Sequence, residues 1–355
     1  MLQYQKTRDL LISHYNRYPK LKIQDIFKYL YQSTFGCEHL ASSLQDVTNN
    51  ILKEYNGLYY NGEPDIEELD GDFSRVPISY IKNGLSVNTM GNLFLSSAKK
   101  QVEGLSVLTE KLVIVKQLIS EKLLPFSENE FNKAVSDWKS CGFSPIHHSE
   151  AFKQAYHPSY RVISNEFIPY LPLFSALDRL LCNGPVKLAV EGGSASGKTT
   201  LSNMLLHIYD CTVFHMDDFF LRPEQRCEER FAQIGGNIDR ERFLQEVLEP
   251  LSKGETVNYR KFDCSTMSIS NAIQVIPKKL TVIEGVYSMH PKFEEYYDFS
   301  VYLNISSQLQ NQRINKRNSP EFAKRFFEEW IPLENVYFDK TKIIQRCSMK
   351  IDIQE

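Results

Sequence analysis

One loop-forming stretch of the chain satisfies the pattern G-x-x-x-x-G-K-[ST] in full: Gly192, Gly193, Ser194, Ala195, Ser196, Gly197, Lys198 and Thr199. It follows an apolar run and opens a helical pattern. Glycines let the backbone curl so that several N–H groups point at an anion, and the N-terminus of the helix adds its positive end. The pattern therefore predicts a P-loop, in which these residues and the following Thr200 bind the phosphates of ATP.

Further side chains could act on those phosphates. Lys198 is expected to lie against the β- and γ-phosphates, and Thr199 to give its hydroxyl to Mg²⁺. Asp217 and Asp218 end the run "VFHMDD", at the edge of a sheet where open α/β folds bind ligands. Asp217 could accept the proton of a substrate hydroxyl there, although an Asp at a strand end also serves local turns. Glu284, in "VIEGVY", is a candidate partner of Mg²⁺ or simply a strand end.

The elements that must position these residues alternate regularly along the chain between short apolar runs and longer segments. Short apolar runs at residues 186–192, 211–218, 279–287 and 299–305 each predict a buried strand, and longer segments separate them. Crossovers between such strands are nearly always right-handed. The pattern therefore predicts an α/β domain with a mostly parallel, doubly wound sheet.

In the first part of the chain the apolar residues are spaced as in helices rather than strands. Apolar residues recur at three and four spacing in 23–31, 105–119 and 131–138, which predicts helices, and Ser127 with Glu130 predicts a capping box at the start of the last one. The segment "YNGEPDIEELDGD" predicts a loop. We therefore expect a mainly α-helical domain over residues 1–164, of unknown role.

A second domain is expected over residues 165–355. The segment "FIPYLPLFSALDRLLCNGP" predicts an amphipathic helix after Pro172, which Asn183, Gly184 and Pro185 would end. Because this stop directly precedes the strand that leads into the P-loop, we place the domain boundary between Ser164 and Pro172.

Composition excludes several other classes of protein. The chain has 355 residues and a formal net charge of −3, so it has no basic surplus for nucleic acid. No window reaches the apolar length of a membrane span, and the N-terminus turns polar too early for a secretory signal. The seven cysteines form no C-x-x-C pair, which suits reduced thiols. We expect a cytoplasmic protein that binds neither nucleic acid nor membrane.

An ordered set of segments in the second half resembles the uridine kinase and phosphoribulokinase branch of P-loop kinases. In chain order they are GGSASGKTT, MDDFF, GGNIDRERF, VNYRKFD and VIEGVY, followed by an Arg/Lys-rich helix, and they lie between Lys187 and Ile344. The first two are specific together, and the others add weight through their order. The resemblance implies a P-loop kinase domain with an arginine-rich lid.

The resemblance also implies roles for individual residues. Asp217 matches the family's catalytic base, and Asp218 a neighbouring or Mg²⁺-linked group. Phe220 matches an aromatic position that contacts the acceptor, whereas Phe219 suits the core equally well. Asp239, in "NID", matches a residue that binds acceptor hydroxyls.

Tyr259 matches the tyrosine of the family's next acceptor segment, but Arg260 and Lys261 follow it where nucleoside kinases show Asp-Phe. Two cations beside the acceptor would favour an anionic or highly hydroxylated substrate, unless they form a solvated surface pair. In the lid segment, Arg313 and Arg317 lie four residues apart on one helical face. Such arginines could offset charge on the transferred phosphoryl group, with Arg317 favoured over Arg313.

Two histidine-containing clusters stand out in the first half. His147 or His148 with His157, Glu150 and His39 could bind a metal, although the spacing is not a standard one. Alternatively, His148, His157 and Arg161 could hold an anion. Helix caps and hydrogen-bonded core positions are the commoner use of such histidines.

The sequence thus favours ATP- and Mg²⁺-dependent transfer of the γ-phosphoryl group to a hydroxyl of a small metabolite, such as a nucleoside, sugar or related alcohol. The alternative is a nucleotide-dependent switch or regulatory binding protein with slow hydrolysis. A switch needs no acceptor residues, so Asp239, Tyr259 and the lid arginines favour the kinase. The expected partner is a small-molecule acceptor, and a homodimer is compatible with the sequence.

Overall fold

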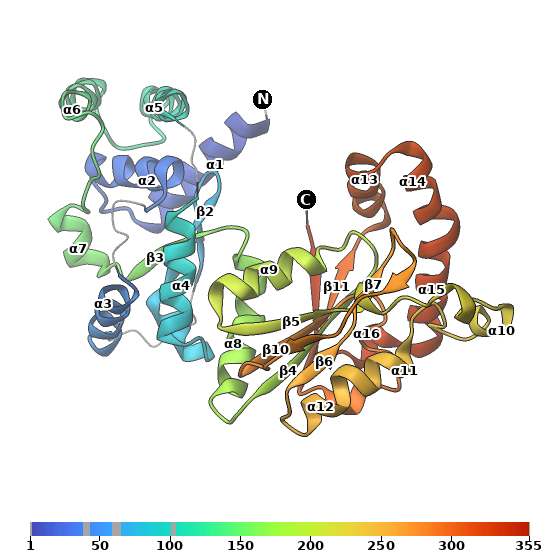
Figure 1. Ribbon diagram of the computed structural model, residues 1–355. Coiled ribbons are helices and arrows are strands. Elements are labelled where there is room, and N and C mark those ends of the chain that lie inside the picture. Colours follow the sequence, from blue (N-terminus) through green and yellow to red (C-terminus); the bar gives the residue numbers. More distant parts are fainter. Residues whose placement is uncertain (1, 38–42, 59–64, 101–103, 355) are drawn as a thin grey trace. The chain divides into compact units, whose positions relative to one another are not determined.

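The computed structural model describes residues 2–37, 43–58, 65–100 and 104–354 (Figure 1). Contacts within the chain divide it into two units, Met1–Ser175 and Ala176–Glu355. This division lies inside helix α8 (Leu171–Leu181), whereas the sequence places the boundary between Ser164 and Pro172. The helix expected after Pro172 is therefore present, and the chain passes from one unit to the next within it.

The N-terminal unit is mainly helical, as predicted. Its α-helices are α1 (Leu2–Arg17), α2 (Ile23–Phe35), α3 (Leu44–Asn56), α4 (Val87–Ala98), α5 (Leu105–Ser120), α6 (Glu128–Ser140) and α7 (Glu150–Tyr156). The expected cap is present, since Ser127 Oγ accepts the Glu130 backbone N–H at 3.2 Å. Phe27 of α2 stacks on Trp138 of α6 with ring centroids 4.8 Å apart. These helices bury the apolar positions whose spacing predicted them.

A small antiparallel sheet in this unit was not predicted. It consists of β1 (Glu67–Glu68), β2 (Phe73–Pro77) and β3 (Tyr160–Ser164), in the order β1-β2-β3. The prediction of a loop over residues 60–72 was wrong at β1, whereas residues 59–64 lie outside the described part of the chain. A two-residue strand is too short to show a period of two. It forms because Glu67 faces inward and Arg75 pairs opposite it.

The C-terminal unit contains the predicted parallel sheet. Its strands are β4 (Val186–Gly192), β5 (Cys211–His215), β10 (Leu280–Glu284), β11 (Phe299–Ile305) and β12 (Met349–Ile353). The order is β12-β11-β4-β10-β5, and every neighbouring pair is parallel. Residues along β10 are buried throughout, as expected for a central parallel strand. The first four strands coincide with the four predicted runs.

Helices cover both faces of this sheet, with α9 on one side and α11, α12 and α16 on the other (Figure 1). The remaining helices and strands complete the unit: α9 (Lys198–Ile208), α10 (Glu228–Phe231), α11 (Arg240–Phe243), α12 (Glu249–Ser252), β6 (Val257–Tyr259), β7 (Phe262–Asp263), β8 (Ser268–Ile269), β9 (Ile273–Val275), α13 (Ser307–Arg317), α14 (Pro320–Arg325), α15 (Ile331–Thr341) and α16 (Ile343–Arg346). Phe214 of β5, Phe243 of α11 and Tyr337 of α15 belong to one buried apolar cluster.

Within the described ranges, no helix combines the length and apolar character that crossing a membrane requires. The seven cysteines are free thiols.

Candidate active site

The P-loop connects β4 to α9 at the carboxyl edge of the sheet. Gly192 ends β4 with a φ of 151°, and a Cβ atom there would lie 2.7 Å from the carbonyl oxygen of Leu303 on the neighbouring strand. Gly197 has a φ of 97° and caps the N-terminus of α9. Both positions require glycine, since a side chain would clash at the first and be strained at the second. The loop backbone therefore forms the tight cradle that the sequence predicted.

The charged and hydroxyl groups of the loop have defined contacts. Lys198 Nζ lies 2.8 Å from the carbonyl oxygen of Gly192 and 2.9 Å from that of Gly193. Thr199 Oγ1 donates to Glu284 Oε1 at 3.3 Å, since β10 pairs in register beside β4. A hydroxyl and a carboxylate oxygen are the hard donors that Mg²⁺ prefers, so these two groups fit a magnesium site.

His215, the last residue of β5, is a third group at this position. Its Nδ1 lies 2.6 Å from Glu284 Oε1, and this hydrogen bond raises the pKa of His215. Glu284 and His215 are paired opposite each other in the parallel ladder, which explains their closeness. A positively charged His215 would compete with a cation for Glu284.

Asp217 lies in a short helical turn directly after β5. In the sheet, β5 is the neighbour of β10, and β10 is the neighbour of the P-loop strand β4. The side chain of Asp217 is exposed, yet the surrounding protein removes enough water to raise its pKa. The positive charge of Lys198 opposes this rise in pKa, and the negative charge of Glu284 adds to it. A carboxylate with a raised pKa is a better proton acceptor than an ordinary aspartate.

Asp218 faces another set of groups. Lys261 Nζ lies 3.0 Å from Asp218 Oδ2, and Arg242 Nη2 donates to the backbone oxygen of Asp218 at 2.9 Å. The Arg242 guanidinium also lies over the ring of Phe219, 4.3 Å from its centroid. Asp218, proposed from the sequence as a Mg²⁺-linked group, is thus paired with a lysine in the structure.

The residues assigned to the acceptor are placed differently from one another. Both oxygens of the buried Asp239 have donors, the Arg242 backbone N–H at 3.2 Å and Gln225 Nε2 at 3.0 Å. Tyr259 is buried and stacks on Phe219. Phe220 is half-buried, with its ring edge toward Phe262.

Arg260 and Lys261 pair with different carboxylates. Arg260 Nε donates to Glu246 Oε1 at 2.8 Å. Lys261, the next residue, is the one that reaches Asp218. Of the two cations that the sequence places beside the acceptor, the structure therefore brings Lys261 to Asp218 and Arg260 to Glu246.

The lid arginines also differ. Arg313 of α13 donates to the carbonyl oxygen of Ala195 in the P-loop at 3.3 Å. Arg317, which the sequence favoured, lies over the ring of Phe326, 5.3 Å from its centroid. Gln310, one turn before Arg313, donates to the carbonyl oxygen of Ser194 at 2.8 Å. Helix α13 thus contacts the P-loop through Gln310 and Arg313.

Helix α15 brings two further residues, Glu334 and Tyr337, to the P-loop. Neither of them was identified from the sequence. Glu334 accepts hydrogen bonds from the backbone N–H and the hydroxyl of Ser194. Tyr337 donates to Glu191, the residue directly before Gly192. Neither residue is part of a short motif, and only their spacing of three on one helix face could have linked them.

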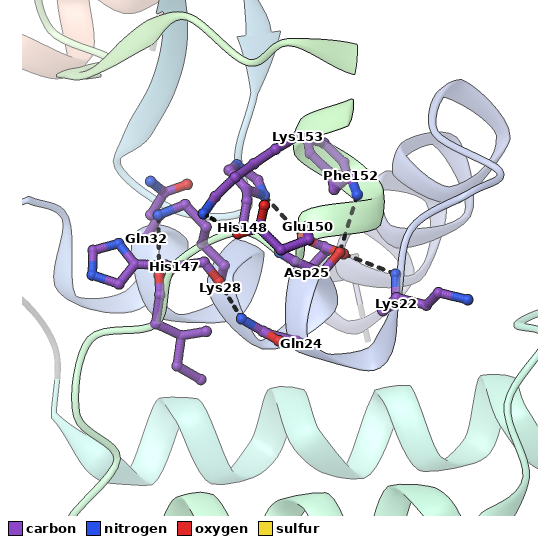
Figure 2. A network of polar contacts seen from close by, with 12 residues as sticks. Lys22, Gln24, Asp25, Lys28, Gln32, His147, His148, Glu150, Phe152 and Lys153 are labelled. Atoms are coloured by element: carbon purple, nitrogen blue, oxygen red, sulfur yellow. Dashed lines mark hydrogen bonds and ion pairs between the residues drawn. The ribbon is translucent and has the colours of Figure 1, made fainter. Parts of the chain in front are cut away.

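His147 and His148 belong to a separate network of polar contacts around α2 (Figure 2). His148 Nδ1 lies 3.0 Å from Asp25 Oδ1, and its Nε2 lies 2.7 Å from Tyr160 Oη. Burial lowers the pKa of His148 to about 4. Asp25 also accepts the Ser149 hydroxyl at 2.6 Å, which fixes the start of α7.

This arrangement separates the predicted cluster. Arg161 pairs with Glu54 at 2.8 Å, and His157 ends α7 in a left-handed conformation. Among the described residues, no three His, Cys, Asp or Glu side chains gather as metal ligands would. His39 lies outside the described residues.

The fold and the loop at its carboxyl edge together define a P-loop kinase-like domain. The model of the Phosphoribulokinase / Uridine kinase family matches residues 188–321, which confirms the resemblance of the C-terminal half to that family. Uridine kinase-like protein 4 of Arabidopsis thaliana is 26% identical over 148 residues, which cover 39% of this chain and 31% of that protein. The chain therefore spans only about a third of this relative's length.

Smaller relatives are covered more fully. A uridine kinase of Staphylococcus haemolyticus is 23% identical over 172 residues, covering 44% of this chain and 82% of that protein. Among solved structures, a possible uridine kinase from Bacillus stearothermophilus is 23% identical and matches with a TM-score of 0.38, covering 51% of this chain and 99% of that chain.

Proposed function

We propose that the C-terminal unit transfers the γ-phosphoryl group of ATP to a hydroxyl of a small metabolite. The observation that carries this proposal is that Lys198, Glu284 and Asp217 lie at the carboxyl ends of the three neighbouring parallel strands β4, β10 and β5. The P-loop would hold the phosphates, and its Lys198 would stabilise charge on the transferred group. Mg²⁺, held by Thr199 and Glu284, would neutralise phosphate charge when bound.

Asp217 would accept the proton of the acceptor hydroxyl as the new bond to phosphorus forms. Its raised pKa suits that task, and its position beyond β5 leaves the carboxylate open to a substrate. Three further side chains would contact the acceptor. Asp218 and Phe220 come shortly after Asp217 in the chain, and Lys261 pairs with Asp218. Uridine, named in the relatives, is one acceptor to offer first, and sugars, sugar acids and pantothenate-like alcohols are the others.

The test is a panel of these acceptors with ATP and Mg²⁺, scored as ADP formed above the rate without acceptor. The variant Asp217→Asn should lower that rate by roughly a thousandfold or more while nucleotide affinity stays near wild type. Asp210→Asn is the matched control, because Asp210 is an exposed carboxylate paired with Lys278 just before β5. A variant at residue 217 that keeps near-normal turnover would refute the base assignment.

The alternative, a nucleotide-dependent switch, predicts a different result in the same assay. No acceptor would then raise ADP formation above background, whereas a protein partner would. The contacts of Lys261 and Arg242 with Asp218 favour the kinase. They place charged side chains beside Asp217, where an acceptor would bind, and a switch needs no acceptor site.

A further inference from the structure

The side chain of Glu334 is bound to the P-loop at its third residue. Its Oε2 accepts the backbone N–H of Ser194 at 2.9 Å, and its Oε1 accepts the Ser194 hydroxyl at 2.5 Å. Glu334 is only 4% exposed. A carboxylate that accepts two hydrogen bonds from one loop residue uses the same donors as a phosphate group would.

The charges around Glu334 show at which end of the loop it lies. Its Oε2 would lie 3.5 Å from a Cβ atom added at Gly193, whose carbonyl oxygen accepts Lys198 Nζ at 2.9 Å. Burial raises the pKa of Glu334, the charge of Lys198 opposes that shift, and the charge of Asp217 adds to it. Glu334 therefore lies near the amine of Lys198 and the carboxylate of Asp217. Under the proposed function, the terminal phosphate of ATP and the acceptor meet between these two groups.

The backbone of α15 is fixed near this contact. Tyr337, one turn beyond Glu334, is fully buried and donates to Glu191 at 3.0 Å. Phe338 lies beside Gly193, where an added Cβ would be 3.7 Å from its ring. Packing therefore fixes the backbone of α15 beside the contact between Glu334 and Ser194.

We propose that Glu334 sets the preference of this site between nucleoside triphosphates and diphosphates. Its carboxylate must leave Ser194 or be neutralised before a terminal phosphate binds, because two anions so close together repel each other. A diphosphate lacks this terminal phosphate, so its binding would leave the contact between Glu334 and Ser194 intact. The inference rests on the proposed function, since it assumes that the P-loop binds nucleotide.

The test compares dissociation constants for ATP and ADP, each with Mg²⁺, by isothermal titration calorimetry. Glu334→Gln removes the charge and keeps an oxygen that can accept the Ser194 N–H. We expect it to tighten ATP binding roughly tenfold and ADP binding less than about twofold. Glu329→Gln is the matched control, because Glu329 lies five residues before Glu334 and is an exposed carboxylate paired with Arg325. It should leave both constants unchanged.

Melting temperatures of the variants show whether each one is folded. A second variant tests the same contact from the side of Ser194. Ser194→Ala removes only the hydroxyl donor, so it should shift the ratio of the two constants in the same direction by a smaller factor. An equal change in both constants, or no change, in folded Glu334→Gln would overturn the inference while leaving the proposed function in place. If neither wild type nor variant binds any nucleotide, the proposed function fails and the inference fails with it.

Discussion

The hydroxyl of Tyr337 donates to Oε2 of Glu191, the buried residue directly before the P-loop, over a distance of 3.0 Å. The same carboxyl group accepts the backbone N–H of Gly192 at 2.8 Å and that of Met289 at 3.1 Å. These donors do not offset the loss of water, and burial raises the pKa of Glu191 to about 7. The base of the loop therefore holds a carboxyl group that ionises near neutral pH.

This ionisation should make the stability of the C-terminal unit depend on pH. A carboxyl pKa raised above its ordinary value gives stability that is complete below about pH 4.5 and is lost as the pH rises through about 7. Glu191→Gln cannot ionise. The free energy of unfolding of the variant relative to wild type should therefore change by about 2 to 3 kcal/mol in the variant's favour between about pH 5 and pH 8.

The measurement is pulse-labelling hydrogen exchange of β4 peptides along a urea series at each pH. Glu328→Gln, which removes an exposed carboxylate paired with Lys324, should follow the wild-type pH profile. A constant difference between wild type and Glu191→Gln at all pH values would contradict the expected ionisation.

The N-terminal unit holds a buried ion pair at its small sheet. Arg75 Nη1 lies 3.0 Å from Glu67 Oε2, and His14 Nδ1 lies 2.6 Å from Glu67 Oε1. The Arg75 side chain is 2% exposed. Despite burial, which acts against it, the charge of Arg75 lowers the pKa of Glu67 to about 2. Glu67 thus keeps its negative charge in the folded unit because the adjacent positive charge of Arg75 stabilises it.

Removing one charge of this pair should be costly. We expect Glu67→Gln to destabilise the N-terminal unit by about 3 kcal/mol at neutral pH, because Arg75 remains buried without its counter-ion. Glu68→Gln is the control one residue away, where the carboxylate is half exposed and paired with Lys6, and it should cost less than about 1 kcal/mol.

Urea denaturation followed through Trp138, the tryptophan of α6, reports on this unit. The loss in Glu67→Gln should shrink as the pH falls from about 4.5 toward 2, because wild-type Glu67 is then protonated as well. Equal effects of the two substitutions would show that burial of the pair does not matter.

The sequence predicted the parts of the molecule whose signals are continuous along the chain. The P-loop is one uninterrupted pattern between a strand and a helix, so Gly192 and Lys198 could be placed from it. The parallel strands were predictable because buried strands are apolar over their whole length. The N-terminal helices followed from periodicity in the same way.

Contacts between distant segments could not be predicted. Glu334 and Ser194 are 140 positions apart, and Asp25 and His148 are 123 apart. Nothing local distinguishes Glu334 from other glutamates of its helix. The choice between Arg313 and Arg317 depended on where α13 meets the P-loop, which their shared helical face does not determine.

The two lid arginines should therefore differ in effect. Arg313→Ala removes the group beside the carbonyl oxygen of Ala195, so we expect kcat to fall roughly a hundredfold with an acceptor that the panel identifies. Arg317→Ala removes a contact with the ring of Phe326. It should lower kcat less than about threefold and reduce stability by about 1 kcal/mol. Steady-state kinetics and thermal melting of both variants separate these outcomes, and the reverse order would restore the sequence-based choice of Arg317.

The neighbours Arg260 and Lys261 offer a second matched pair, this time for the acceptor. Successive residues of an extended segment point to opposite sides, which explains why one cation reaches Glu246 and the other Asp218. Lys261→Met should remove the cation that pairs with Asp218, the residue next to Asp217. We expect the KM for the acceptor to rise roughly tenfold, with the KM for ATP changed less than about twofold, because the loss lies on the acceptor side.

Arg260→Met removes an equal charge at the adjacent position and should change neither KM by more than about twofold, since the Arg260 side chain is half exposed and Glu246 keeps a second cation, Arg242, at 3.7 Å. Initial-rate kinetics with each substrate varied in turn give both constants. If Lys261→Met instead raised the KM for ATP, Lys261 would serve the nucleotide. An effect confined to Arg260→Met would mean that the acceptor lies on the Glu246 side of the strand, away from Asp217.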